Sequence, residues 1–286
     1  MGHLHKPVTI DDWETETRTD LFSHHTMKHE SFAVDAFREG QGPGVLGRFL
    51  DIMEQHGTSV AATAIGARAI ILDGDPDTGR LADNMAVQGV PRVYDKKFLA
   101  PNEQRWAPGA KGVPTLIEIV RQDMRGYLEE LHSETDILSG VFGDLFSRAF
   151  IDNWNKTDEL SMLMRQNNLK TNFTAPPQYN VGGIISQLKL VANLIALRDE
   201  RGNGINRDVF FVEMGGFDSH FKVTTVLENK FPSLNMAVKL FWEEIKAQNI
   251  DRSVVVIQGS EFGRTITPNS NLGSDHAWGG NYFMFG

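Results

Sequence analysis

The sequence predicts an α/β fold in which a doubly wound, mostly parallel sheet has helices on both faces, with helical and loop insertions. Two apolar runs, "RDVFFVEM" (207–214) and "RSVVVIQGSEFG" (252–263), have the continuous hydrophobicity of strands that are covered on both sides. Between them, "NMAVKLFWEEIKAQNI" (235–250) has the pattern of an amphipathic helix. A strand, a helix and a strand in this order form a right-handed parallel unit, so we expect both strands in one sheet.

The preceding segments predict further elements. "GPGVLGRFLDIMEQHG" (42–57) indicates a helix, and "TSVAATAI" (58–65) a strand after it. Residues 74–113 are rich in Gly, Pro and Asp and are expected to form a loop-rich insertion. Residues 114–200 have mostly helical patterns. The inward faces are expected to be Leu46, Phe49, Leu50 and Met53 in the first helix, Ile184, Leu188, Val191, Leu194 and Ile195 near residue 190, and Met236, Leu240, Phe241 and Ile245 in the last.

The length and composition suit one large domain over residues 1–286, since 286 residues with 41% hydrophobic side chains can bury a full core. The first 22 residues have neither strand alternation nor a capped helix, and the sequence stops within the apolar run "GGNYFMFG". We therefore expect a domain that is incomplete at both ends.

The charge and the missing cysteines exclude several classes of function. The net charge is −9 and Lys and Arg never occur in runs longer than two, so nucleic acid is not an expected partner. An anionic substrate would need a cation to offset this background. The absence of cysteine excludes disulfides, thiolate zinc sites and a cysteine nucleophile. The apolar runs are too short for a membrane span, and the first 20 residues contain no signal-peptide core.

Polar side chains gather where the predicted strands end, which is where open parallel sheets bind ligands. Side chains two apart in an extended segment share a face, so Asp218 and His220 can turn toward one ion. Carboxylate and imidazole groups are ligands for zinc, manganese or magnesium, and an arginine can bind a phosphate or sulfate through two parallel hydrogen bonds. Three loops supply these groups: "GGFDSH" with Asp218 and His220, "GSEFGR" with Glu261 and Arg264, and "NSNLGSDHAWGGN" with Asp275 and His276.

Each of these residues also has a purely structural interpretation. Asp218 can cap a helix that begins near Phe221, which would leave His220 on the surface. Glu261 can cap the turn after its strand or pair with Arg264 three residues later. The recurrence of such groups in three successive loops favours the metal site.

A histidine-rich segment, "FSHHTMKHES" (22–31), lies near the start of the chain. On a helix, His25 and His29 would share a face at the spacing that zinc helices use, but there is no HExxH arrangement, and a solvated turn is the preferred interpretation. Ser23 and Thr26 are candidate hydroxyl nucleophiles in the same segment.

Several of these motifs together resemble the domain of unknown function 1501 family. The resemblance rests on "FFVEMGGFDSH" (210–220) and "VVVIQGSEFGRTITPNSNLGSDHAWGGNYFMFG" (254–286), with "FSHHTMKHESFAVDAF" (22–37) and "GPGVLGRFLDIM" (42–53) earlier in the chain. It implies an alkaline-phosphatase-like fold, shared with sulfatases and cofactor-independent phosphomutases. It also implies export to the periplasm or the medium, because many members carry a twin-arginine signal.

The resemblance further implies a metal-dependent hydrolase of sulfate or phosphate esters, acting on a small anionic ester or a sulfated polysaccharide. Asp218, His220 and His276 would bind one divalent metal ion (zinc, manganese or calcium), with Glu261 and Asp275 as further ligands, Arg264 on the anion and Ser23 or Thr26 as nucleophile. Phe262 stands where the superfamily has a histidine of a second metal site. We also expect the superfamily's opening strand, which carries another ligand, to be missing from this sequence. The alternative is therefore an inert member that binds an anion, a polysaccharide or a protein.

Overall fold

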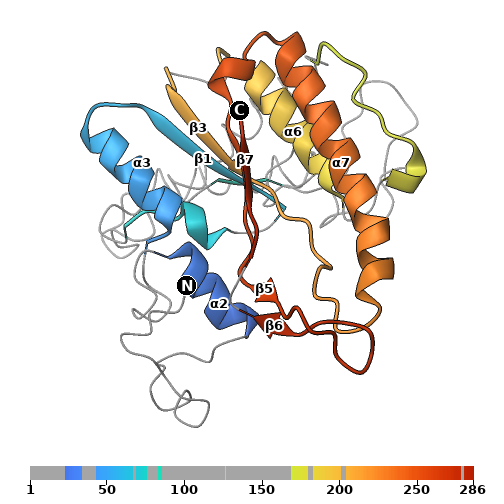
Figure 1. Ribbon diagram of the computed structural model, residues 1–286. Helices are drawn as coiled ribbons and strands as arrows, with labels where there is room; N and C mark the ends of the chain where they lie inside the picture. The colour runs from blue at the N-terminus through green and yellow to red at the C-terminus, as the bar shows by residue number, and fades with distance from the viewer. Residues whose placement is uncertain are drawn as a thin grey trace. The chain divides into compact units, whose positions relative to one another are not determined.

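The computed structural model describes residues 23–33, 43–66, 69–75, 83–85, 126, 169–179, 183–200, 204–277 and 280–286. The chain divides into two units, residues 1–88 with 168–286 and residues 89–167. Gly126 is the described residue of the second unit, so the structure below is that of the first (Figure 1). Most of the predicted insertion at 74–113 and of the helical region at 114–200 lies outside the described residues.

A three-stranded parallel sheet forms the centre of the described fold. It has the order β2-β1-β3, with β1 at Val60–Ile65, β2 at Asp83–Met85 and β3 at Arg207–Phe211. Thr63 of β1 is in register with Asp83 on one side and Phe210 on the other. The predicted strands at 58–65 and 207–214 are thus confirmed, and β2 is a strand inside the segment that was expected to be loop. Strand β3 is only half-buried, and the described residues contain no large doubly wound sheet.

Helix α3 (Val45–Gln55) packs on β1 and on the short 3-10 helix η1 (Ile70–Leu72). Leu50 is fully buried there, as predicted, but Phe49 is 56% exposed. The prediction for Phe49 was wrong because the buried face of α3 runs through Gly47, Leu50 and Asp51, one position away from the apolar stripe. The core beneath this face contains Leu50, Ala62, Ala64, Ala69 and Leu72.

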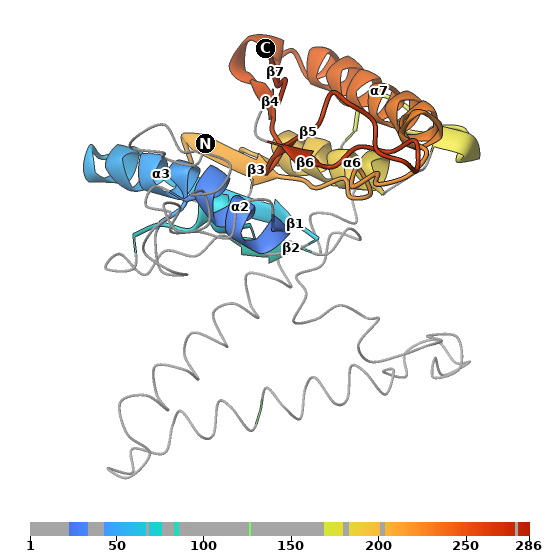
Figure 2. The ribbon, with the colours of Figure 1, turned by 60° about the horizontal axis from the view of Figure 1, so that its bottom comes forward.

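Two long helices, α6 (Ile184–Ala196) and α7 (Val223–Ala247), lie side by side (Figure 2). All five residues predicted to face inward from α6 are buried, and so are Leu240, Phe241 and Ile245 of α7. Helix α7 begins twelve residues before the predicted segment and includes Pro232. In the described ranges, no helix has the length and apolarity that a membrane span requires.

Two buried polar side chains of these helices hold neighbouring backbone. The Glu244 carboxylate of α7 accepts hydrogen bonds from the backbone amides of Lys170 (3.0 Å) and Thr171 (2.7 Å). Gln187 of α6 donates from Nε2 to the carbonyl oxygen of Glu213 (2.7 Å) and accepts from its amide at Oε1 (2.9 Å). The Gln187 side chain thus makes the two hydrogen bonds to the backbone of Glu213 that a neighbouring strand would otherwise make. These bonds fix the chain between β3 and the loop that contains Asp218.

The second predicted strand differs from expectation. Strand β4 (Val256–Gln258) pairs antiparallel with β7 (Phe283–Phe285) in a separate two-stranded sheet, and Ile257 is 67% exposed. The predicted parallel pairing with β3 is therefore not made within the described residues. The remaining elements are short: α2 (His24–Phe32), η5 (Pro177–Tyr179), η6 (Asp251–Ser253), β5 (Gly263–Arg264) and β6 (His276–Ala277).

Candidate functional site

The loop after β3 places Asp218 and His220 on one face. Gly216 has a φ of +83°, which an L side chain rarely adopts, and it turns the chain just before Asp218. Ser219 between the two is buried at 4% exposure, so it points away from them, as the alternation predicted. Lys230 of α7 donates a hydrogen bond to the carbonyl oxygen of Gly215 (2.9 Å) and so attaches this loop to α7.

Strands β5 and β6 bring the two later loops to the same place. They pair antiparallel, with Arg264 in register with His276. The backbone of Gly273 lies so close to that of His220 that a Cβ atom at position 273 would clash with the His220 carbonyl group. A β-bridge between Phe221 and Leu272 closes the contact between these loops.

Three candidate ligand atoms converge where these loops meet. The Oδ1 atom of Asp218 lies 2.9 Å from Nε2 of His220 and 2.9 Å from Nε2 of His276. The two Nε2 atoms are 3.1 Å apart. Phe262 stacks on the His276 ring, with the ring centroids 4.0 Å apart, and fixes its plane. The sequence analysis singled out Asp218, His220 and His276 as candidate metal ligands, and the structure brings these three side chains together.

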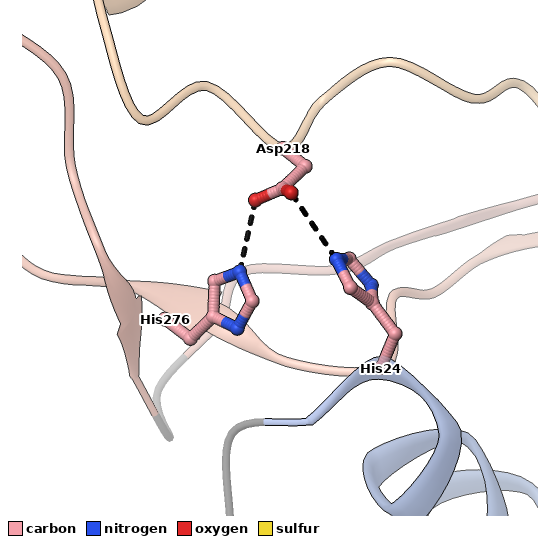
Figure 3. Close-up of side chains that lie close together, drawn as sticks. All are labelled: His24, Asp218 and His276. Carbon is pink, nitrogen blue, oxygen red and sulfur yellow. Dashed lines mark hydrogen bonds and ion pairs between the residues drawn. The ribbon is translucent and has the colours of Figure 1, made fainter.

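A fourth group, His24, reaches the cluster from the first turn of α2. Its Nε2 atom lies 3.2 Å from Oδ2 of Asp218, and its Nδ1 atom lies 2.9 Å from Oε1 of Glu261. Figure 3 shows the His24 and His276 rings on either side of the Asp218 carboxylate. His24, Asp218 and His276 each offer one ligand atom, and these atoms all lie within 4.8 Å of one another.

The sequence reasoning missed His24, although it singled out the segment that carries it. His25 and His29, the pair with zinc-helix spacing, pack on each other with ring centroids 4.8 Å apart. The Ser23 hydroxyl accepts a hydrogen bond from the amide of Thr26 (3.2 Å) and is the N-cap of α2. The one available signal was that cap, because a helix that begins after Ser23 presents His24 on its first turn.

Arg264 contacts Asp218 and Ser274 through its guanidinium group. Its Nη1 donates to Oδ1 of Asp218 (2.7 Å), its Nε donates to the Ser274 hydroxyl (3.0 Å), and its Nη2 donates to the Ser274 carbonyl oxygen. Arg264 therefore links Asp218 to Ser274, two residues before β6. Glu261 does not pair with Arg264, and Asp218 does not cap α7, whose N-cap is Lys222.

The charges of the cluster are coupled through Asp218. Burial by itself would raise the pKa of the Asp218 carboxyl group, but its hydrogen-bonding contacts with Arg264, His276 and His24 hold this pKa well below its ordinary range. Glu261 raises the pKa of His24 by accepting its hydrogen bond, against the opposing effect of burial. The hydrogen bond from His220 lowers the pKa of Asp275. The site thus holds ionised carboxylates next to imidazoles.

Comparison with protein-family models finds that residues 190–286 match the family described as "Protein of unknown function (DUF1501)". The matched segment contains Asp218, Glu261, Arg264, Asp275 and His276, but not His24. Searches of curated proteins and of solved structures give no match.

Proposed function

We propose that Asp218, His220 and His276 bind a divalent metal ion and that the protein hydrolyses sulfate or phosphate esters at this site. The observation that carries the proposal is the convergence of one carboxylate oxygen and two imidazole nitrogens at separations of 2.9–3.1 Å. Nitrogen and oxygen ligands around a tetrahedral zinc ion lie about 2.0–2.1 Å from it, and hence roughly 3.3 Å from one another. The donor set therefore fits such an ion after small side-chain movements.

A cation would satisfy this arrangement when the ring hydrogen of His220 is on Nδ1. His220 faces the Asp275 carboxylate with Nδ1 and the Asp218 carboxylate with Nε2. When Nδ1 donates to Asp275 and the ring is neutral, Nε2 carries a lone pair. The lone pair faces an ionised carboxylate oxygen 2.9 Å away and a second imidazole nitrogen. A cation between these atoms converts the repulsion into coordination.

The surroundings suit a substrate with a negatively charged ester group. The first turn of α2 lies at the cluster through His24, and the N-terminus of a helix attracts anions. Ser23 and Thr26 lie on this turn and are the proposed nucleophiles, and Arg264 is the nearby cation. When bound, the metal ion would supply Lewis-acid polarisation of the ester oxygen.

The finer fold assignment belongs to the same proposal. We expect the three-stranded parallel sheet to be part of an alkaline-phosphatase-like, doubly wound sheet, because β1 and β3 are parallel and Asp218 follows the carboxyl end of β3. Phe262 fills the position of the superfamily's second metal ligand with a buried aromatic ring, so one metal ion is proposed.

The test is metal content followed by turnover. The protein is reconstituted with zinc, manganese or calcium, dialysed and assayed by elemental analysis, and is expected to retain one equivalent of one of these ions. The double variant His220→Ala/His276→Ala is expected to retain none. His25→Ala, whose imidazole packs on His29, is the matched control and is expected to retain the ion. Stoichiometric metal in the double variant would refute the site.

Aryl sulfates and aryl phosphates then serve as substrates for the loaded protein. Turnover that is lost in the double variant and kept in His25→Ala supports the hydrolase. If the protein retains the metal but hydrolyses neither aryl sulfates nor aryl phosphates, it is better explained as a binding module for anions. The presence of Phe262 where the superfamily has a metal ligand is compatible with that function.

A further inference from the structure

Two histidines of the site have the same pattern of neighbours. His220 directs Nε2 toward Asp218 (2.9 Å to Oδ1) and Nδ1 toward Asp275 (3.0 Å to Oδ1). His24 directs Nε2 toward Asp218 (3.2 Å to Oδ2) and Nδ1 toward Glu261 (2.9 Å to Oε1). Each imidazole thus lies between the central carboxylate and an outer one.

We propose that Glu261 and Asp275 are positioning residues, and that His24 joins His220, His276 and Asp218 as a direct metal ligand. In this arrangement each outer carboxylate accepts the Nδ1 hydrogen of its histidine and so leaves the lone pair on Nε2, facing the metal. The inference rests on the proposed function for the metal itself. It changes the sequence-based assignment, in which Glu261 and Asp275 were ligands and His24 was not.

The placement of the outer carboxylates supports this role. An imidazole coordinates a metal ion through one nitrogen, so a carboxylate that faces the opposite nitrogen lies on the far side of the ring from that ion. Asp275 and Glu261 have this position relative to His220 and His24. As direct ligands, both would have to leave the hydrogen bonds that they make here.

Asp275 is itself held in place by Asn269. The Nδ2 group of Asn269 donates to Oδ1 of Asp275 (3.0 Å) and to the backbone carbonyl oxygen of His220 (2.9 Å). Its Oδ1 atom accepts from the backbone amides of Asn271 and Gly273, at 3.0 Å each. One asparagine therefore fixes both the carboxylate and the backbone of the histidine that it orients.

Glu261 is tied to the helix that carries His24. The Ser31 hydroxyl, on α2, donates to the backbone carbonyl oxygen of Glu261 (2.8 Å). The Phe262 ring lies 4.9 Å from the His24 ring, centroid to centroid, and limits its rotation. Helix α2 is thus connected with the chain before β5 at two points: at His24, through Phe262, and at Ser31, through Glu261.

The first test reads the tautomers directly, without metal. In ¹⁵N-labelled, metal-free protein at about pH 9, above the ordinary pKa of imidazole, long-range ¹H–¹⁵N spectra identify the protonated nitrogen of each ring. Both His24 and His220 are expected to carry the hydrogen on Nδ1. Asp275→Ala is expected to remove this preference in His220 only, and Glu261→Ala in His24 only. Hydrogen on Nε2 of either ring in the wild-type protein would overturn the inference.

The second test is zinc titration of the same variants. Asp275→Ala and Glu261→Ala are expected to bind one zinc ion with roughly 10- to 100-fold lower affinity, the usual effect of losing an outer hydrogen-bond partner. Asp275→Asn and Glu261→Gln keep a carbonyl oxygen that can accept the Nδ1 hydrogen, so they are expected to lose less affinity and also serve if the alanine variants do not fold. His24→Ala is expected to lose stoichiometric binding.

The results separate this inference from the proposed function. If the wild-type protein binds no metal, the proposed function fails, while the tautomers still decide the roles of Glu261 and Asp275. If Asp275→Ala or Glu261→Ala loses stoichiometric zinc as His24→Ala does, these residues are ligands and the inference is overturned. An unchanged zinc affinity in both alanine variants contradicts it as well.

Discussion

Replacing Glu244 with alanine is expected to destabilise the described fold by about 3–5 kcal/mol. Its carboxylate is completely buried and is an acceptor in four hydrogen bonds. The donors are the backbone amides of Lys170 (3.0 Å) and Thr171 (2.7 Å), the Thr171 hydroxyl (2.6 Å) and the Gln248 side chain (2.8 Å). The hydrogen bonds from Lys170 and Thr171 attach their segment to helix α7.

The magnitude follows from the groups that the substitution leaves without an acceptor. A hydrogen bond to a charged group contributes about 1.5–3 kcal/mol, and each buried donor that loses its partner costs about 1–3 kcal/mol. Four such bonds would sum to more than the predicted value. The free-energy cost of burying the Glu244 charge offsets part of this sum, because the alanine variant no longer has that cost.

The same contacts determine the pH dependence. Burial by itself would raise the pKa of Glu244, but the hydrogen bonds from Thr171, Lys170 and Gln248 lower it below its ordinary value. A lowered pKa in the folded state means that the unfolded chain takes up the proton first as the pH falls. The stabilisation is therefore complete above the unfolded pKa, about 4.3, and is lost as the pH falls through the folded value.

Urea unfolding of the metal-free protein at pH 7 and at about pH 4 measures both effects. Glu243→Ala is the matched control, because Glu243 is the exposed neighbour and, among the residues that the structure describes, has only the surface ion pair with Lys239 at 3.9 Å. Its expected cost is below about 1 kcal/mol. If Glu244→Ala costs no more than Glu243→Ala, or loses as much stability on acidification as the wild-type protein, the account of the buried carboxylate is wrong.

Three further substitutions test other contacts. Gly273→Ala is expected to lower the free energy of unfolding by about 3 kcal/mol and to abolish zinc binding, because the new methyl group would clash with the backbone of the loop that carries His220. Gly259→Ala is the control: its methyl group meets open space, so zinc titration should be unchanged. Equal titrations for both would contradict the close approach. Gln187→Ala is expected to cost about 2 kcal/mol in urea unfolding, since it removes both hydrogen bonds to the chain after β3, and an unchanged midpoint would refute this role. Phe262→Ala is expected to cost about 3 kcal/mol by removing the buried ring stacked on His276, with thermal unfolding as the measurement and an unchanged Tm as the contrary result.

The elements with a clear local pattern were predictable from the sequence. Strand β1 and helix α6 occupy their expected segments, because each has an uninterrupted apolar pattern that its own length of chain determines. The start of α7 was not predictable in this way. Its first turns contain Val223, two threonines and then Pro232, all poor helix formers, and packing overrides their propensities.

The pairing of β4 was not predictable either. Its apolar sequence fits a buried central strand, but it pairs with β7, and alternation or apolarity alone does not specify a partner. Phe49 illustrates the same limit for a helix. The helical period predicts an apolar stripe, while the close approach of α3 at Gly47 to the backbone of Leu72 and Asp73 decides which side of that stripe is covered.

The candidate site was predictable where its ligands share a loop or follow neighbouring strands. Asp218, His220 and His276 were singled out as candidates because strand ends of parallel sheets collect ligands and because alternation places residues two apart on one face. His24 could not be found by such rules, since nothing near it in the sequence indicates its partners. Sequence reasoning also cannot distinguish a carboxylate that binds a metal from one that orients an imidazole, because both are acidic residues next to histidines.

The contact between His24 and Glu261 joins residues 237 positions apart, and that between His24 and Asp218 joins residues 194 positions apart. During synthesis the N-terminal histidine is made long before the loops that complete its surroundings, so the cluster cannot assemble on the ribosome until residue 276 has emerged. Contacts of such long range also form late in folding, because the entropy of closing the loop must be overcome first. Metal capture at this site would therefore mark the completion of the fold, and an ion taken up by the chain would report that both ends of the described unit have come together.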